Sequence, residues 1–197
     1  MRLGIDLDNT IIDYSRAFAE AASVAGIAPA ALAGSKTALR DGLRAQPGGE
    51  LIWQQVQALA YGPLIERAEP FPGVEAFFAR ARERGLALAI VSHKSEFAAA
   101  APAGPNLRDC AQAWLDARGF VRNGEPAVYF EATRAAKCAR IEALGLTHFI
   151  DDLIEVFADP AFPRTCERWL FAPDDDATDP PAERIFHNWS DLAEAAF

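Results

Sequence analysis

Leu3-Gly4-Ile5-Asp6-Leu7-Asp8-Asn9-Thr10 (residues 3–10) is an apolar run that ends in two aspartates. The apolar residues predict a buried strand, and acids at alternate positions project to the same side if the backbone stays extended. Open parallel sheets bind ligands beyond the carboxyl ends of their strands, which is where Asp6 and Asp8 would lie. A hard cation such as Mg²⁺ would relieve the repulsion between them and attract a phosphate. Turn-forming aspartates are the plainer alternative for this stretch alone.

A second apolar run, at residues 148–150, also ends in paired acids, Asp151 and Asp152. Two acidic pairs at two strand ends favour a cation site more strongly than either pair alone. A calcium-binding EF-hand loop does not fit the first pair. Its sixth and twelfth positions would be Ile11 and Ala17, where that loop needs Gly and Glu.

Further short apolar runs predict strands that are buried on both faces, as in a parallel sheet covered by helices. These runs lie at residues 86–91, 127–130 and 168–171. Helical patterns lie between the runs, at residues 74–84, 109–118 and 134–144. Each of these helices is followed by a glycine (Gly85, Gly119 or Gly145) and then an apolar residue, a pattern typical of a helix end that leads into a buried segment. The alternation predicts an α/β fold.

Residues 14–70 carry helical patterns without a convincing strand, so we expect a helical insertion after the first strand. The predicted domains are therefore a sheet domain of residues 1–13 and 71–197 and an insertion of residues 14–70. Toward the end of the chain, an acidic, proline-rich loop at residues 173–181 precedes an apolar run and a short closing helix.

Two further segments could supply groups that bind phosphate. Ser92-His93-Lys94 follows the run at residues 86–91, and a hydroxyl with backbone N–H groups at a strand end can hold phosphoryl oxygens. A capped turn is the plainer interpretation, and His93 could contact substrate or serve only as a structural hydrogen-bonding group. Lys137 lies near the start of a predicted helix, where a lysine is usually solvated, and Arg134 is a rival cation.

Composition restricts the classes of partner. The net charge of −9 argues against general affinity for nucleic acid or an anionic membrane, but a recruited cation would still allow a phosphorylated substrate. The three cysteines form no disulfide or zinc pattern, so we expect a reducing compartment, the cytoplasm. Neither a signal peptide nor a membrane-spanning run is expected. The oligomeric state stays open.

Taken in order, the four segments resemble the haloacid dehalogenase-like (HAD) superfamily. That pattern has D-x-D-x-T after a first strand, Ser or Thr after a second, Lys ahead of a helix, and an acidic pair after a later strand. The matching residues are Asp6, Asp8, Thr10, Ser92, Lys137, Asp151 and Asp152. The resemblance spans roughly residues 1–155 and implies a Rossmann-like, three-layer α/β/α fold with a parallel sheet. It also implies that the insertion is a small helical cap.

The resemblance implies a Mg²⁺-dependent phosphatase that acts on a small phosphorylated metabolite. Asp6 would be the nucleophile that becomes phosphorylated, and Asp8 would be the general acid and base. Asp8 also favours phosphate chemistry, because the members that cleave carbon–halogen bonds lack an acid at that position. Ser92 would bind a phosphoryl oxygen, and Lys137 would balance negative charge.

The same resemblance implies a metal site and its surroundings. Asp6, the Asp8 backbone carbonyl and Asp151 would hold Mg²⁺. The supporting or substrate-contacting residues would be Thr10, His93, Lys94 and Asp152.

The insertion offers candidates for the mouth of a cap, although apolar packing and solvated charge explain them more simply. These candidates are Trp53, Tyr61, Arg40, Arg44 and Arg67. Three other interpretations concern the same residues. A two-component receiver domain has the wrong motif order and is too short. A non-catalytic relative stays open although all the expected groups are present, and so does a phosphotransferase or mutase that uses the same residues.

Overall fold

The computed structural model describes residues 1–27, 36–174 and 181–197 of the chain. The chain divides into two compact units. The first unit comprises Met1–Ile12, Pro70–Lys94 and Asp116–Phe197, and the second comprises Asp13–Glu69 and Ser95–Leu115.

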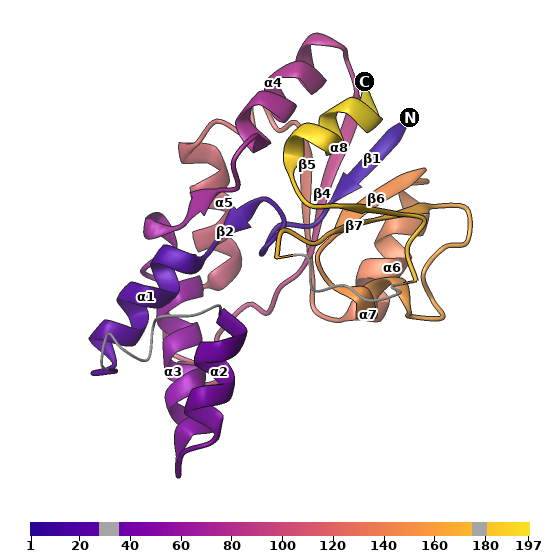
Figure 1. The fold of residues 1–197 in the computed structure, drawn as a ribbon. Helices are drawn as coiled ribbons and strands as arrows, with labels where there is room; N and C mark the ends of the chain where they lie inside the picture. Colours follow the sequence, from indigo (N-terminus) through magenta and orange to yellow (C-terminus); the bar gives the residue numbers. More distant parts are fainter. Residues whose placement is uncertain (28–35, 175–180) are drawn as a thin grey trace. The chain divides into compact units, whose positions relative to one another are not determined.

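The first unit is built on a six-stranded sheet with the order β5-β4-β1-β6-β7-β8, in which every neighbouring pair is parallel (Figure 1). The strands are β1 (Arg2–Ile5), β4 (Ala87–His93), β5 (Ala127–Glu131), β6 (His148–Asp151), β7 (Glu167–Phe171) and β8 (Arg184–Phe186). The predicted α/β fold with a parallel sheet is confirmed. The first acidic motif follows β1 and the second lies at the end of β6, and these two strands are neighbours at the centre of the sheet.

Helices α6 (Arg134–Ala143) and α7 (Ile154–Phe157) cover one face of the sheet. Their buried side chains pack against residues of β4, β6 and β7, including Val91, Phe149 and Leu170. Burial of these strands on both faces explains why their sequences are continuously apolar and do not alternate between apolar and polar.

Helices α4 (Val74–Glu83) and α8 (Trp189–Ala196) belong to the opposite layer. Trp189 is fully buried there, with its ring centroid 5.0 Å from that of Phe77 and 5.9 Å from that of Phe171. The Trp189 indole nitrogen also donates to the carbonyl oxygen of Thr10 at 3.2 Å. This bond anchors the loop that carries the first acidic motif to the packed interior.

The predicted helix ends at glycine are present. Gly85, Gly119 and Gly145 all have positive φ, at 62°, 68° and 58°. Glycine adopts this left-handed conformation without the steric cost of a Cβ atom, so each helix can close its last turn and lead into the next buried segment.

Three details of the sheets differ from the sequence prediction. β4 continues to His93, so Ser92 lies inside the strand and not after it. β8 forms where only an apolar run was predicted. Two short strands, β2 (Ile12–Asp13) and β3 (Glu69–Pro70), pair with each other where the chain passes between the units, a region for which no strand was expected.

The second unit is helical. It contains α1 (Ser15–Val24), α2 (Lys36–Arg44), α3 (Gly49–Tyr61), the 3₁₀ helix η2 (Ile65–Arg67) and most of α5 (Leu107–Ala117). The prediction assigned residues 95–115 to the sheet domain, whereas the structure groups them with the helices. The indole of Trp114 in α5 donates to the carbonyl oxygen of Ala68 at 3.0 Å, which ties this segment to the helical unit.

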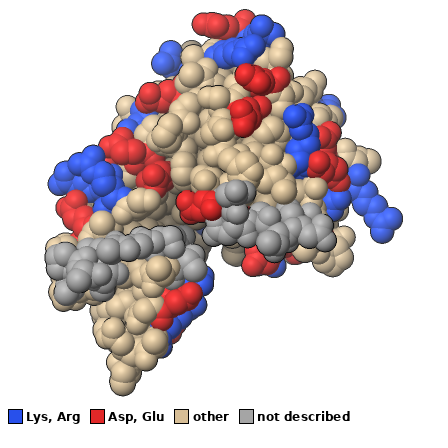
Figure 2. Space-filling view, viewed as in Figure 1, with Lys and Arg blue, Asp and Glu red and all other residues tan. Residues whose placement is uncertain are grey.

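Parts of two predicted segments, residues 28–35 of the insertion and 175–180 of the acidic loop, lie outside the described residues. None of the helices that the structure describes is long and apolar enough to cross a membrane. Figure 2 shows acidic and basic side chains interspersed on the face in view, without an extended basic surface among the described residues there.

Candidate active site

The two acidic motifs meet at the carboxyl edge of the sheet because β1 and β6 are parallel and in register. Ile5 pairs with Ile150, and the Asp6 amide donates to the Ile150 carbonyl oxygen at 2.8 Å. Asp6 and Asp151 are buried, with 4% and 0% of their surface exposed. Buried carboxylates need partners, and their nearest charged partner comes from α6.

Lys137 is that partner. Its ammonium nitrogen lies 2.6 Å from Asp6 Oδ1 and 2.6 Å from Asp151 Oδ2. The side chain is 1% exposed, so the ordinary expectation of a solvated helical lysine does not apply here. A local contact fixes the start of helix α6: the Thr133 hydroxyl caps the helix by accepting a hydrogen bond from the Ala136 amide at 3.1 Å. The cap fixes the first turn, from which Lys137 extends to the sheet edge.

Asp6, Asp151 and Lys137 form a buried triad in which Asp6 exists in both its protonated and ionised forms near neutral pH when no cation is bound. The pKa of Asp6 is raised from 3.8 to about 7, mainly by burial. Lys137 opposes this rise, and the neighbouring charges of Asp151 and Asp8 contribute to it. Burial alone would lower the pKa of Lys137, but Asp151 and Asp6 together hold it above its ordinary value. When Asp6 is ionised, one ammonium serves two carboxylates, and the triad carries an excess of negative charge that a bound cation would balance.

The carboxylates of Asp6, Asp151 and Asp152 each offer one oxygen, and these three oxygens lie within 4.8 Å of one another. Asp151 Oδ1 accepts from the Leu153 amide at 3.0 Å, and Asp152 Oδ1 accepts from the Thr10 hydroxyl at 3.3 Å. An all-oxygen set beside uncompensated negative charge fits a hard divalent cation such as Mg²⁺. The sequence placed Asp152 in a supporting role, whereas the structure includes it among the possible ligands.

The Asp8 carboxylate has a different partner. Its two oxygens lie 2.6 and 2.9 Å from the ammonium nitrogen of Lys94, whose side chain is 4% exposed. Asn9 follows with φ of 61°, a left-handed conformation that Asn tolerates better than most residues. This turn allows the Asn9 amide to donate to the Ile12 carbonyl oxygen at 3.0 Å, which closes the loop after β1.

Ser92 and His93 diverge, as successive residues of a strand must. Ser92 is 1% exposed and lies two positions beyond Ile90, which pairs with Ile5 of β1, so it reaches the same edge as the acidic motifs. His93 is exposed, and its Nε2 contacts the Ala132 carbonyl oxygen at 3.2 Å. The structure therefore favours the structural interpretation of His93 that the sequence left open.

The predicted candidates on the insertion have partners within the helical unit. Trp53 is 2% exposed and stacks on Phe18 with ring centroids 5.4 Å apart. Tyr61 meets Phe18 edge-on, also at 5.4 Å. The three arginines form exposed ion pairs: Arg40 with Asp41, Arg44 with Glu50 and Arg67 with Glu20. Packing and solvated charge account for these side chains.

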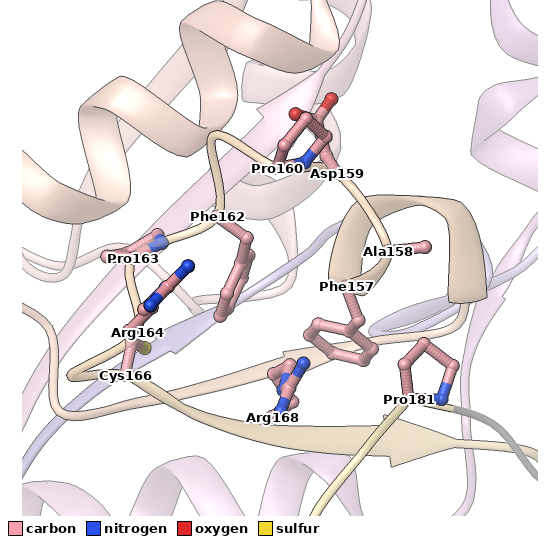
Figure 3. Close-up of a pocket in the computed structure, with 10 residues that line it drawn as sticks. All are labelled: Phe157, Ala158, Asp159, Pro160, Phe162, Pro163, Arg164, Cys166, Arg168 and Pro181. Carbon is pink, nitrogen blue, oxygen red and sulfur yellow. The ribbon is translucent and has the colours of Figure 1, made fainter.

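A separate cavity of about 730 Å³ lies beside α7 and the start of β7 (Figure 3). Phe157 and Phe162 line it with their rings edge-to-face, 5.4 Å between centroids. Arg168 also lines it but is bound to Glu183, and burial raises the pKa of Cys166 to about 12, so that thiol stays protonated. None of the residues predicted for the site lines this cavity.

No protein-family model and no curated protein matches this sequence. Solved structures do match it in fold. A haloacid dehalogenase-like family protein from Streptococcus pneumoniae superposes with a TM-score of 0.63 at 14% identity, covering 98% of this chain and 97% of that one. The chain has the HAD fold.

Two other HAD-type structures show the same likeness over almost the whole chain. A HAD family hydrolase from Deinococcus radiodurans, solved with bound phosphate and sodium, gives a TM-score of 0.61 at 11% identity, covering 98% of this chain and 93% of that one. A predicted phosphoglycolate phosphatase from Haemophilus somnus gives 0.60 at 15% identity, covering 100% and 97%. These likenesses, at 11% and 15% identity, concern the fold.

Proposed function

We propose that this chain is a Mg²⁺-dependent phosphatase that hydrolyses a small phosphomonoester through an aspartyl-phosphate intermediate on Asp6. The observation that carries the proposal is the buried contact of Lys137 with both Asp6 and Asp151, 2.6 Å to each, inside a cluster of three carboxylates. With its carboxylates ionised, such a cluster carries excess negative charge, which suits it to a divalent cation and, through that cation, to a phosphate.

Asp6 would attack phosphorus, so that a bond forms between its carboxylate oxygen and phosphorus while the bond to the leaving oxygen breaks. Asp8 would give that oxygen a proton and later accept one from the water that hydrolyses the aspartyl phosphate. Ser92 would donate to a phosphoryl oxygen, and Lys137 would stabilise the charge that builds up during transfer. Asp6, the Asp8 carbonyl and Asp151 would hold Mg²⁺, with Asp152 close by, and the ion would neutralise and orient the phosphoryl group.

The bound phosphate and sodium of the Deinococcus radiodurans hydrolase support a phosphate and a cation as ligands of this fold. The predicted phosphoglycolate phosphatase supports a small organic phosphate as the substrate class. Asp8 supports phosphatase over dehalogenase chemistry. The leaving alkoxide needs a proton, and the water that hydrolyses the aspartyl phosphate must lose one, so the reaction needs a group beside Asp6 that can give and take a proton.

We also propose that the insertion at residues 14–70 serves as the cap that selects the leaving group. The cytoplasm is the proposed compartment, because Cys110, Cys138 and Cys166 are all free thiols.

The test is hydrolysis of p-nitrophenyl phosphate by the wild type and by Asp6→Asn, with Mg²⁺ and with EDTA. We expect wild-type turnover that requires the metal and falls by at least about a thousandfold in Asp6→Asn, because a carboxamide cannot serve as the nucleophile. Asp109→Asn, an exposed aspartate outside the site, is the matched control and should retain full activity.

Equal inactivity of the wild type and Asp6→Asn, on this ester and on a panel of phosphorylated metabolites, would favour a non-catalytic binding module. Transfer to added alcohols faster than to water would favour a phosphotransferase. Either result would overturn the proposed hydrolysis.

A further inference from the structure

Lys94 and Asp8 form a second, partly buried ion pair at the sheet edge, beside the triad of Asp6, Asp151 and Lys137. The lysine is 4% exposed and the Asp8 side chain is 20% exposed. The pair joins residues 86 positions apart, because β4 and β1 lie side by side in the sheet. Because the lysine is buried and the aspartate partly buried, the pair is less screened by solvent than a surface pair.

Both oxygens of Asp8 lie within hydrogen-bonding distance of the Lys94 ammonium, at 2.9 Å from Oδ1 and 2.6 Å from Oδ2. A carboxylate bound through both oxygens to one donor cannot rotate without breaking a contact. The contact with Lys94 uses one lone pair of each oxygen and therefore restricts the direction of the carboxylate.

We propose that Lys94 is a positioning residue that orients the Asp8 carboxylate for proton transfer to the leaving oxygen. The inference rests on the proposed phosphatase function and adds a residue to it. A transferred proton must lie within hydrogen-bond reach of its acceptor, so fixing Asp8 lowers the cost of reaching that arrangement.

The role makes a specific prediction about leaving groups. In the first half-reaction a bond forms between the Asp6 carboxylate oxygen and phosphorus while the ester oxygen–phosphorus bond breaks, and the departing oxygen takes the proton from Asp8. Phenolate is basic and needs that proton, whereas p-nitrophenolate leaves readily as an anion. The two esters differ little in size, so a change in binding should alter kcat/KM for both by the same factor. The ratio of the two kcat/KM values therefore isolates the effect on proton transfer.

The experiment measures kcat/KM for phenyl phosphate and p-nitrophenyl phosphate in the wild type, Lys94→Met, Asp8→Asn and the double variant. Lys94→Met should lose roughly tenfold to a hundredfold on phenyl phosphate but only a few fold on p-nitrophenyl phosphate. Asp8→Asn should show the same selectivity, and the double variant should be no worse than Asp8→Asn, because the two residues act as one unit.

Arg140→Met is the matched control, because it removes an ion pair with Glu131 in the same unit, outside the site. This variant should leave the ratio of the kcat/KM values for the two esters unchanged. Near-ultraviolet circular dichroism checks that each variant folds. If Lys94→Met does not fold, Lys94→Gln, which keeps one donor group, makes the same comparison. Lys94→Arg keeps the positive charge and should retain more of the kcat/KM for phenyl phosphate than Lys94→Met does.

Three results would overturn the proposal. Equal losses on both esters would make Lys94 a phosphoryl-binding group, multiplicative losses in the double variant would make it independent of Asp8, and no loss would remove its role. In each case the wild type still turns over, so the phosphatase assignment stands. A wild type inactive on both esters would instead overturn the assignment and this inference together.

Discussion

Lys137 is the residue on which the charge balance of the site depends, because it is the shared partner of two buried carboxylates. Lys137→Met would leave Asp6 and Asp151 buried without that partner. We predict a loss of about 3–5 kcal/mol in the free energy of unfolding, measured with urea near neutral pH, together with loss of phosphatase activity.

Arg140→Met is the control for this loss as well. Its side chain is 41% exposed in its pair with Glu131, so its removal should cost less than about 1 kcal/mol. Similar losses in the two variants would contradict the special position of Lys137.

The raised pKa of Asp6 gives the metal-free protein a specific pH dependence. The folded pKa is about 7 against an ordinary value of 3.8, so the folded state holds a proton that the unfolded state releases. Stability from this group is therefore complete below about pH 4 and is lost as the pH rises through about 7. In EDTA, the wild type should lose a few kcal/mol of stability between about pH 5 and pH 8 relative to Asp6→Asn.

Mg²⁺ should remove this difference, because the cation stabilises the ionised form of Asp6. Urea titrations of the wild type and Asp6→Asn between about pH 5 and pH 8 measure the difference in the free energy of unfolding. Parallel profiles for the two proteins in EDTA would show that Asp6 is not the group responsible.

Within the elements, β1 is packed closely enough that its glycine has no room for a side chain. A Cβ on Gly4 would overlap the side chains of Leu146 and Phe149, which are both buried. Gly4→Ala should therefore destabilise the protein by about 1–3 kcal/mol through overpacking. It should also lower activity, since Asp6 lies two residues further along.

Gly42 in α2 is the matched comparison, because a Cβ there would meet nothing within 4 Å. Gly42→Ala should stabilise the protein by roughly 0.5–1 kcal/mol, since alanine is the better helix former. Thermal and urea unfolding of both variants test the pair, and the same sign in both would be inconsistent with the packing described.

Elements with a strong local signal could be predicted from the sequence, and those that depend on tertiary pairing could not. The strands beginning at Ala127 and His148 are apolar runs bounded by glycine-closed helices, so local pattern was sufficient. β8 has only three residues, two of them exposed, and it exists because it pairs with β7. Such a strand gives little local signal.

The same distinction applies to the site. Asp6 and Asp151 were predicted because each ends a buried strand. The pairing of Lys94 with Asp8 was not, because nothing in the local sequence relates residues so far apart, and only the adjacency of β4 and β1 brings them together. The grouping of residues 95–115 with the helical unit was missed for a similar reason, since it depends on contacts such as that of Trp114 with Ala68.

For the molecule as a whole, cation binding should appear as added stability, because a ligand that binds only the folded state shifts the unfolding equilibrium. Mg²⁺ at a hundred times its dissociation constant contributes about 2.7 kcal/mol. For a chain of this length we expect a rise in Tm of about 5–10 °C by calorimetry. Asp151→Asn should abolish the rise, and an equal rise in that variant would place the cation elsewhere.

The claim on which the whole account depends is that Asp6 carries the phosphoryl group during turnover. The direct measurement is acid quenching of the Asp8→Asn variant during reaction with p-nitrophenyl phosphate and Mg²⁺, followed by peptide mass spectrometry. The account predicts one added phosphoryl group on the peptide that contains Asp6, and none with EDTA or in an Asp6→Asn protein. A phosphoryl group on any other residue, or turnover with no phosphorylated peptide, would contradict it.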